Sequence, residues 1–257
     1  VILLVATVAT VMSCKKLDLL NEDVKSATEV PSATLFSNAI KNLSVQETTP
    51  SVNNNVFRAF AQYWTETTYT DESNYDILNR KIPDNEFRTL YRDVLADLKE
   101  AKRVSDGESD VVSTAAEKKN RAALTEILTV FTYQRLVDIF GNVPYEDALD
   151  INNILPKYDD AKTIYSKLFA RLDAAIAELN AAEGSFGSAD LIYGGDVALW
   201  KTFANSLKLK MAITVADETS LNPGAIATSA VAAGVFTSAA DGAMFSYLDA
   251  SPNTNPV

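Results

Sequence analysis

The apolar positions of the chain recur at helical spacing, most clearly in residues 124–149, LTEILTVFTYQRLVDIFGNVPYEDAL. In the first half they lie at i, i+3, i+4 and i+7, which places them on one helix face: Leu124, Ile127, Leu128 and Phe131. In the second half they move to another face: Tyr133, Leu136, Val137 and Phe140. A helix with two apolar faces contacts two neighbours, so we predict an inner helix of a multi-helix array. Gly141 and Pro144 predict its end, because glycine suits the left-handed position after a helix and proline cannot continue it.

The same spacing predicts further helices on both sides of this stretch. They cover residues 31–45, 56–67, 84–104 and 160–179, a segment from residue 196 onward, and a short Ala-rich helix after residue 222. Suitable N-cap residues begin three of them: Asp84, Asp160 and Asp196. The remaining segments lack a helical period, and we predict loops at 68–83, 105–110, 150–159 and 184–195, with a short strand or irregular coil at 235–247. The pattern therefore predicts a mainly all-α domain, an antiparallel helical array with long loops.

The charge balance and the residue counts exclude several classes of function. There are 23 Lys and Arg against 34 Asp and Glu, a formal net charge of −11. Such a chain repels phosphate backbones, so we expect no nucleic-acid partner. It contains no His and one Cys, which excludes Ser-His-Asp and Cys-His catalysis and a His/Cys metal cluster. We expect no cofactor and no metal site.

The first residues differ from the rest of the chain. Residues 1–12, VILLVATVATVM, are apolar but shorter than the roughly 20 residues that a bilayer-spanning helix needs. We interpret residues 1–13 as the remaining part of a signal peptide. The following Ser13-Cys14 is similar to a bacterial lipobox, in which the cysteine is lipidated; a chance thiol is the alternative. We expect Cys14 to carry the lipid, residues 14–30 to form a tether, and residues 31–257 to form the helical domain.

Two blocks of the sequence together resemble the SusD/RagB family, outer-membrane lipoproteins of the Bacteroidetes. The first is FTYQRLVDIFGNVPYEDAL, which is similar to the family's long helix ending in an LFGDVPY turn. The second is DLIYGGDVALWKTFANSLKLKMAIT, residues 190–214. The resemblance implies a tetratricopeptide-like array of helices. Because SusD-like proteins are considerably longer, it also implies that this chain corresponds to the N-terminal portion of one.

The resemblance carries an expectation about function. SusD-like proteins bind oligosaccharides or, in the RagB branch, peptides at the cell surface, and they pass the ligand to a SusC-like TonB-dependent transporter on which they sit. They are not enzymes. The resemblance therefore implies a lipid-anchored nutrient-binding protein of the outer membrane, without catalytic residues.

One stretch of the chain combines side chains suited to sugar recognition. Aromatic rings stack on the apolar faces of pyranose rings, while polar side chains hydrogen-bond to the hydroxyl groups. We predict ligand contacts from Trp64, Tyr69, Asn74 and Tyr75. Trp64 also lies on the apolar stripe of the predicted helix 56–67, so a core position is an alternative of equal weight. We expect Trp200 in the core, since it is in register with Phe203 and Leu207.

Two functions of other classes remain open at this stage. A glycoside hydrolase needs two carboxylates about 5 to 10 Å apart across a cleft, and no spacing in the sequence specifies such a pair. A helical scaffold on the outer membrane that binds only protein would suit the predicted array equally well. Binding of an intact oligosaccharide would indicate the nutrient-binding protein, and its cleavage would indicate the hydrolase. The absence of both would indicate the scaffold.

Overall fold

The computed structural model describes residues 29–250 and 253–256, and within these ranges the regular structure is helical. The α-helices are α3 (Ser32–Thr48), α4 (Phe57–Phe60), α5 (Ile82–Arg88), α6 (Ala96–Gly107), α7 (Ala115–Phe140), α8 (Ala161–Glu178), α9 (Val197–Thr214) and α10 (Pro223–Ala233). A π-helical segment, Thr89–Leu95, joins α5 to α6 without a break. Single 3-10 turns lie at Glu72–Asn74, Gly187–Ala189, Thr219–Leu221 and Ala239–Asp241. The prediction of a mainly α-helical fold is confirmed.

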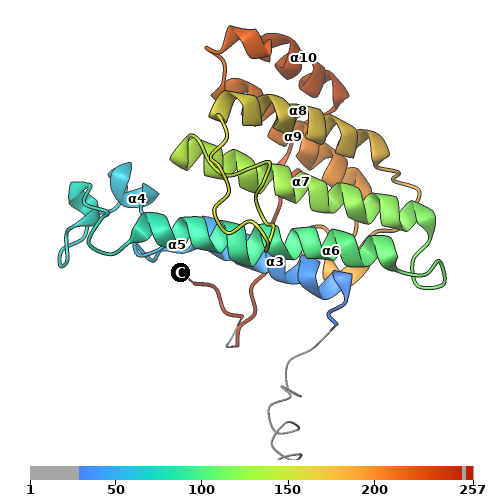
Figure 1. The fold of residues 1–257 in the computed structure, drawn as a ribbon, viewed down its shortest axis with the longest axis horizontal. Coiled ribbons are helices and arrows are strands. Elements are labelled where there is room, and N and C mark those ends of the chain that lie inside the picture. The colour runs from blue at the N-terminus through green and yellow to red at the C-terminus, as the bar shows by residue number, and fades with distance from the viewer. Residues whose placement is uncertain (1–28, 251–252, 257) are drawn as a thin grey trace, which may run out of the picture. The chain divides into compact units, whose positions relative to one another are not determined.

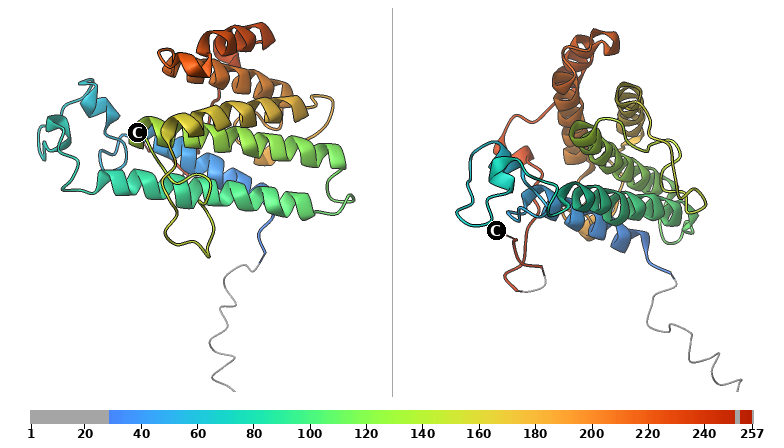
Figure 2. Two further views of the ribbon diagram at one scale, coloured as in Figure 1. Left: turned by 45° about the horizontal axis from the view of Figure 1, so that its top comes forward. Right: turned by 60° about the vertical axis from the view of Figure 1, so that its left-hand side comes forward.

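The long helices of the unit Pro31–Val257 form an antiparallel array. Helix α3 packs against α6, α6 against α7, α7 against α8 and α9, and α9 against α10. Successive long helices run in opposite directions in Figures 1 and 2. The array leaves the short α4 and the segment that follows it at one end, beyond the start of α5 (Figure 1).

Helix α7 is the inner helix that the hydrophobic pattern predicts. It begins with a capping box in which the Glu117 backbone N–H donates to Thr114 Oγ1 over 3.1 Å and the Thr114 N–H donates to Glu117 Oε2 over 2.8 Å. It ends at Gly141, whose φ of 73° is the left-handed conformation that favours glycine. Residues from both predicted faces are fully buried, among them Leu124 and Leu136, and the helix contacts α6 on one side and α8 on the other. Phe131 differs from the prediction because it is only half-buried.

The structure corrects two helix predictions near the start of the domain. The helix predicted at 56–67 is a single turn, α4, after which the chain reverses at Gln62 with a φ of 58°. The N-terminus predicted at Asp84 is wrong, since α5 starts at Ile82. Pro83 is tolerated there because the first turn of a helix needs no hydrogen bond from its N–H. Asp84 lies in this first turn, where its charge suits the positive end of the helix dipole.

The two later N-cap predictions are confirmed. Asp160 accepts a hydrogen bond from the Thr163 backbone N–H at the start of α8, and Asp196 accepts bonds from two backbone N–H groups at the start of α9. Within α9, Trp200 is 1% exposed and belongs to the core, as predicted. Residues 235–247 are irregular and contain one 3-10 turn, Ala239–Asp241.

Asp190 organises the loop that precedes α9. Its carboxylate is 2% exposed and accepts hydrogen bonds from three backbone N–H groups and from the Trp200 indole Nε1, the last at 2.6 Å. The loop closes at Gly195, which has a φ of 90° and lies so close to Gly187 that a Cβ would meet its backbone at 2.8 Å. Only glycine fits both conditions at position 195, and the φ of 61° at the preceding Gly194 also favours glycine.

Candidate functional site

Residues 61–81, here called the aromatic segment, expose several large side chains to solvent. The exposed fractions are 83% for Tyr63, 48% for Trp64, 77% for Tyr69, 55% for Tyr75 and 80% for Leu78. Figure 1 shows that the segment projects from the end of the helical array next to α4. Several exposed apolar side chains of this size within one segment make it a candidate binding site for a ligand or a partner.

The four residues predicted to contact a ligand all lie in this segment, and all are exposed. Trp64 is not a core residue: the guanidinium of Arg58, in α4, lies 5.1 Å from its ring centroid. Tyr75 rests against Phe60, also in α4, with ring centroids 5.1 Å apart. Helix α4 therefore positions two of the predicted aromatic rings.

The other two predicted residues are positioned within the segment itself. The guanidinium of Arg80 lies 5.6 Å from the ring centroid of Tyr69 and donates to the Tyr69 carbonyl oxygen over 3.1 Å. The Asn74 side-chain amide donates to the Thr70 carbonyl oxygen over 2.9 Å, which commits one of its donors to the local turn. Tyr69 is thus the more accessible of the two for a ligand.

A buried carboxylate lies within the aromatic segment itself. Glu72 is fully buried, and its Oε1 lies 3.3 Å from Arg80 Nε. Burial raises the pKa of Glu72, and the opposite charge of Arg80 lowers that pKa only in part. The ion pair holds Arg80 in the position from which it covers one face of Tyr69. Glu72 and Arg80 therefore act as positioning residues for that ring.

The backbone of the aromatic segment adopts an unusual conformation at several non-glycine residues. Gln62, Tyr69, Tyr75 and Lys81 have φ values between 53° and 65°. Each such residue costs roughly 1 kcal/mol or more, so the surroundings must compensate. Part of that compensation is a hydrogen bond from the Glu66 N–H to Ser73 Oγ over 2.9 Å. The rings are thus presented by one defined turn structure, as a pre-organised binding surface requires.

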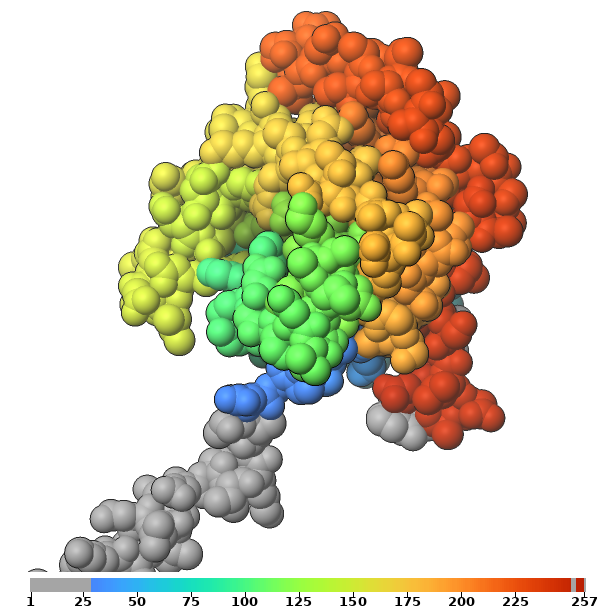
Figure 3. All heavy atoms as spheres, turned by 90° about the vertical axis from the view of Figure 1, so that its right-hand side faces the viewer, coloured from blue at the N-terminus to red at the C-terminus, as the bar shows by residue number. Residues whose placement is uncertain are grey.

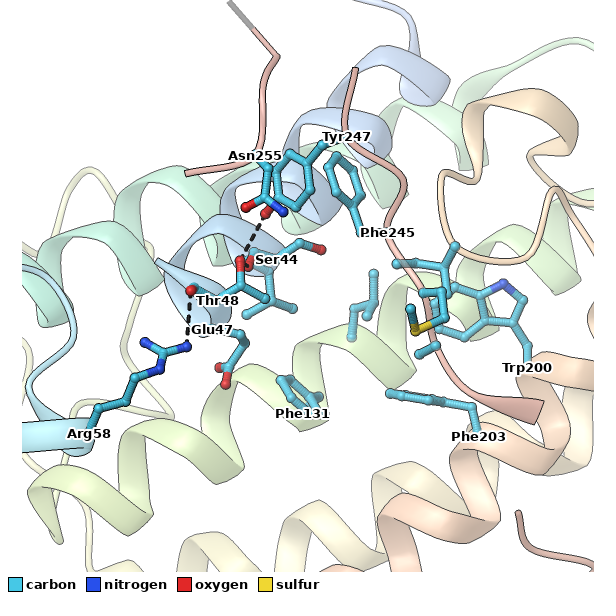
Figure 4. Close-up of a pocket in the computed structure, with 15 residues that line it drawn as sticks. Ser44, Glu47, Thr48, Arg58, Phe131, Trp200, Phe203, Phe245, Tyr247 and Asn255 are labelled. Atoms are coloured by element: carbon cyan, nitrogen blue, oxygen red, sulfur yellow. Dashed lines mark hydrogen bonds between the residues drawn. The ribbon is translucent and has the colours of Figure 1, made fainter. Parts of the chain in front are cut away.

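A cavity of about 470 Å³, here called the apolar groove, lies between α3, α7, α9, residues 243–247 and Asn255 (Figure 4). Its aromatic lining residues are Phe131, Trp200, Phe203, Phe245 and Tyr247. Polar groups lie at one end, where Figure 4 shows Arg58 bonded to Thr48 and Thr48 bonded to Tyr247. The distances are 3.0 Å from Arg58 Nη2 to the Thr48 carbonyl oxygen and 2.9 Å between Thr48 Oγ1 and the Tyr247 hydroxyl. Arg58 therefore contributes both to this groove and to the aromatic segment.

A smaller polar pocket of about 240 Å³ shares Glu47 and Phe131 with the apolar groove. Lys210 lines it, with Nζ 5.4 Å from the Phe131 ring centroid and 3.2 Å from Gln134 Oε1, to which it donates. Burial raises the pKa of Glu47, against the opposing effect of Arg135. The two cavities together offer aromatic walls with charged and amide groups at one end, a chemistry that suits a ligand with both apolar faces and hydroxyl groups.

The sequence reasoning missed the lining residues of the groove. The pattern predicts Phe131 on an apolar helix face that packs in the core, and a short strand or irregular coil at 235–247 with no site role for Phe245 or Tyr247. The sequence offers one indication that Phe245 and Tyr247 act together: a spacing of two residues places both rings on the same side of an extended chain. Their ring centroids lie 4.7 Å apart.

The described residues contain neither a metal-binding cluster nor a membrane-spanning helix. Between residues 29 and 256, leaving out 251–252, no three His, Cys, Asp or Glu side chains are grouped to hold a metal ion. In the same part of the chain no helix has the length and apolarity to cross a bilayer. The proposed lipidation residue, Cys14, lies outside the described residues.

Comparison with known proteins identifies a family that covers most of the chain. Residues 24–257 match a family model, SusD-like, described as starch-binding and associating with the outer membrane. No curated protein matches the chain.

Several solved structures share the fold. A chitin-binding protein is 27% identical, with a TM-score of 0.69 over 82% of this chain and 45% of its own. A SusD homologue from Bacteroides uniformis is 26% identical, with a TM-score of 0.62 over 88% of this chain and 45% of its own. A SusD homologue from Parabacteroides distasonis is 23% identical, with a TM-score of 0.70 over 88% of this chain and 44% of its own. The chain thus spans less than half the length of these structures.

Proposed function

The chain belongs to the SusD-like family of starch-binding proteins that associate with the outer membrane, and on that basis we propose that it binds an oligosaccharide at the cell surface and delivers it to a SusC-like TonB-dependent transporter. We further propose that the aromatic segment contacts the ligand through Trp64, Tyr69, Asn74 and Tyr75. A lipid on Cys14 would hold the protein on the outer membrane.

The observation that carries this proposal is the exposure of the rings in the aromatic segment. Tyr69 is 77% exposed and Tyr75 is 55% exposed, although the domain has ample core in which to bury aromatic side chains. Each ring is held on one side by a neighbouring residue, Arg80 or Phe60. A pyranose ring stacking on the accessible side would gain a large contact area without ordering a flexible side chain, because the rings already have fixed positions.

The comparisons favour a saccharide over a peptide as the ligand. The family description names starch, and one structural neighbour is described as chitin-binding. Both polymers consist of pyranose units with apolar faces, which aromatic side chains recognise by stacking. A peptide ligand remains the second possibility within the same proposal.

Glu47, which lines the groove, and Glu86 have a structural role that does not suit a glycoside hydrolase. Glu47 and Glu86 both pair with Arg135, at 2.9 Å and 2.8 Å. The two carboxylates are held on one guanidinium and not on opposite sides of a cleft, as the catalytic pair of a glycoside hydrolase requires. We therefore propose a binding protein and not a hydrolase.

Isothermal titration of the protein with maltooligosaccharides and chitin oligosaccharides tests the proposal. Tyr69→Ala and Tyr75→Ala should each weaken binding by about tenfold, equivalent to ~1.4 kcal/mol, with an unchanged melting temperature. Val231→Ala, an exposed apolar position on α10, is the control and should bind like wild type. Chromatography of the recovered ligand should show it intact.

Other outcomes would contradict specific parts of the proposal. Equal affinity in both tyrosine variants would remove the aromatic segment from the site. Cleaved ligand would indicate a hydrolase. Absence of binding to either saccharide series, with a partner protein still captured, would favour the scaffold function.

A further inference from the structure

The connection between α7 and α8 exposes four large apolar side chains at its tip. Ile151 is 91% exposed, Ile154 84%, Leu155 86% and Tyr158 64%. Figures 2 and 3 show this connection projecting from the helical array. These four residues, here called the first apolar tip, have no place in the proposed ligand site.

The base of this connection is held firmly, so the tip has a defined position. Val143 and Asp159 form an antiparallel bridge across it. The Asp159 carboxylate accepts hydrogen bonds from the Tyr145 and Glu146 backbone N–H groups at 3.0 and 2.8 Å. Lys99 in α6 donates to the Leu149 carbonyl oxygen over 2.6 Å. The domain therefore presents the apolar side chains on a fixed support.

A second pair of apolar residues lies in the turn between α6 and α7. Val111 is 97% exposed and Val112 is 66% exposed; they are here called the second apolar tip. The turn is adjacent to the start of α3, because Ser32 Oγ donates to Glu108 Oε1 over 2.5 Å. Residue 32 is also the first helical residue after the proposed lipid-bearing tether.

The first apolar tip and the start of α3 lie on the same side of the helical array. Both views in Figure 2 and the view in Figure 3 agree on this placement. Helix α10 lies on the opposite side (Figure 1). The second apolar tip thus lies next to the start of α3, where the proposed tether would enter the domain, and the first lies on the same side of the array.

The basic side chains around the tips are held in ion pairs, and acidic side chains, Asp150 and Asp160 among them, outnumber them. Lys157 lies 3.5 Å from Asp147 and 3.8 Å from Asp159, and Lys167 pairs with Glu146. At the second tip Lys118 lies 3.0 Å from Asp110. Paired charges lose less solvation energy at an interface, and the described residues around the tips form no free basic cluster that would attract anionic lipids. The surface therefore matches an uncharged or zwitterionic lipid surface.

From this geometry we infer that the two apolar tips insert into the headgroup region of the membrane and orient the domain on it. The inference rests in part on the proposed lipid anchor. A bilayer surface can accept two separate apolar tips at once, whereas a single protein recess would need them on one continuous face. The apolar side chains would leave water while the paired charges stay at the level of the headgroups.

A site-specific fluorescent label tests the inference. Because the chain has a single cysteine, the background Cys14→Ala permits one labelling position at a time and removes any acyl chain. An environment-sensitive fluorophore would be attached at Ile154→Cys or Val111→Cys in the full chain, with Val231→Cys on α10 as the matched control. Phosphatidylcholine vesicles, with and without a lipid-borne quencher, are the probe.

We expect a blue shift of the emission and quenching at positions 154 and 111, and neither at position 231. No response at 154 and 111 would overturn the inference, as would an equal response at 231 or a response to anionic vesicles only. A response at 154 to a purified transporter but not to vesicles would overturn it in favour of a protein partner. Saccharide binding is measured without vesicles, so failure of this inference is distinguishable from failure of the proposed function.

Discussion

The guanidinium of Arg135 in α7 lies 2.8 Å from the carboxylate of Glu86 in α5, and its Nη1 lies 2.9 Å from Glu47 in α3. One cation thus joins three helices at the end of the array nearest the aromatic segment. Burial raises the pKa of Glu86 and of Glu47, and Arg135 lowers both pKa values only in part. The junction is therefore sensitive to pH.

The first prediction concerns this pH dependence. A carboxyl group whose pKa is raised by folding contributes stability that is complete below its unfolded pKa and is lost as the pH rises through the folded pKa. Glu86→Gln resembles the protonated form at every pH. The free energy of unfolding of wild type, relative to this variant, should therefore increase as the pH falls from 7 toward 4.5. Urea unfolding at several pH values measures it.

Glu100→Gln is the matched control for that experiment. The hydrogen bond from Arg103 lowers the pKa of Glu100, which is a surface group. Its small contribution should be present near neutral pH and decrease as the pH falls, opposite in sign to Glu86. A constant difference between wild type and Glu86→Gln across the range would contradict the assignment.

The second prediction separates two neighbours on α7. Leu128 is 5% exposed, and Leu128→Ala should lower the free energy of unfolding by about 2 to 5 kcal/mol. Phe131 is half-buried and borders the apolar groove, so Phe131→Ala should cost about 1 to 2 kcal/mol, between the buried and exposed limits. Chemical denaturation of both variants checks the order. A larger loss for Phe131→Ala would mean that the groove is closed over that ring.

The third prediction tests Asp190 as the organiser of the loop before α9. Asp190→Ala removes the acceptor of several buried N–H groups, each of which costs about 1 to 3 kcal/mol when left unpaired. We expect a loss of roughly 3 kcal/mol or more. Asp190→Asn keeps one carbonyl acceptor and should lose clearly less, and Trp200 fluorescence should report the change locally. Equal losses would show that the negative charge, and not the hydrogen bonds, holds the loop.

The fourth prediction concerns Cys14, outside the described residues. If Cys14 carries the lipid, Cys14→Ala should leave the protein soluble or as an unprocessed precursor, since no acyl chain then anchors it. Membrane fractionation with immunodetection measures the distribution. Wild-type recovery of the variant in the outer-membrane fraction would exclude lipidation as the anchor.

The family resemblance stated from two sequence blocks is confirmed by the family match, and the reason lies in local chemistry. A few adjacent residues determine the backbone conformations at several features of the fold. These features include the end of α7 before Gly141, the N-caps Asp160 and Asp196, and the closed loop at Gly195. Such requirements can be recognised in a linear sequence without knowledge of the packing.

The aromatic segment shows where local pattern was insufficient. Phe57, Phe60 and Trp64 have helical spacing, but the helix ends after one turn and Trp64 is 48% exposed. A short helix is marginal unless neighbouring elements cover its apolar face, and periodicity does not reveal whether they do. The exposure of Tyr69 and Tyr75 agrees with the loop prediction, while their role as ligand contacts stays a prediction.

By itself, the sequence determined the class of fold, the inner helix, most helix ends and the family, because hydrophobic period and capping chemistry act over a few residues. Only the tertiary structure decided that Phe131 of α7 meets Tyr247 and Arg58 at one groove, and that one arginine joins the buried Glu86 to the half-buried Glu47. Those residues are far apart in the chain. Their proximity follows from how whole helices pack, which depends on the sum of many weak contacts and not on any local motif.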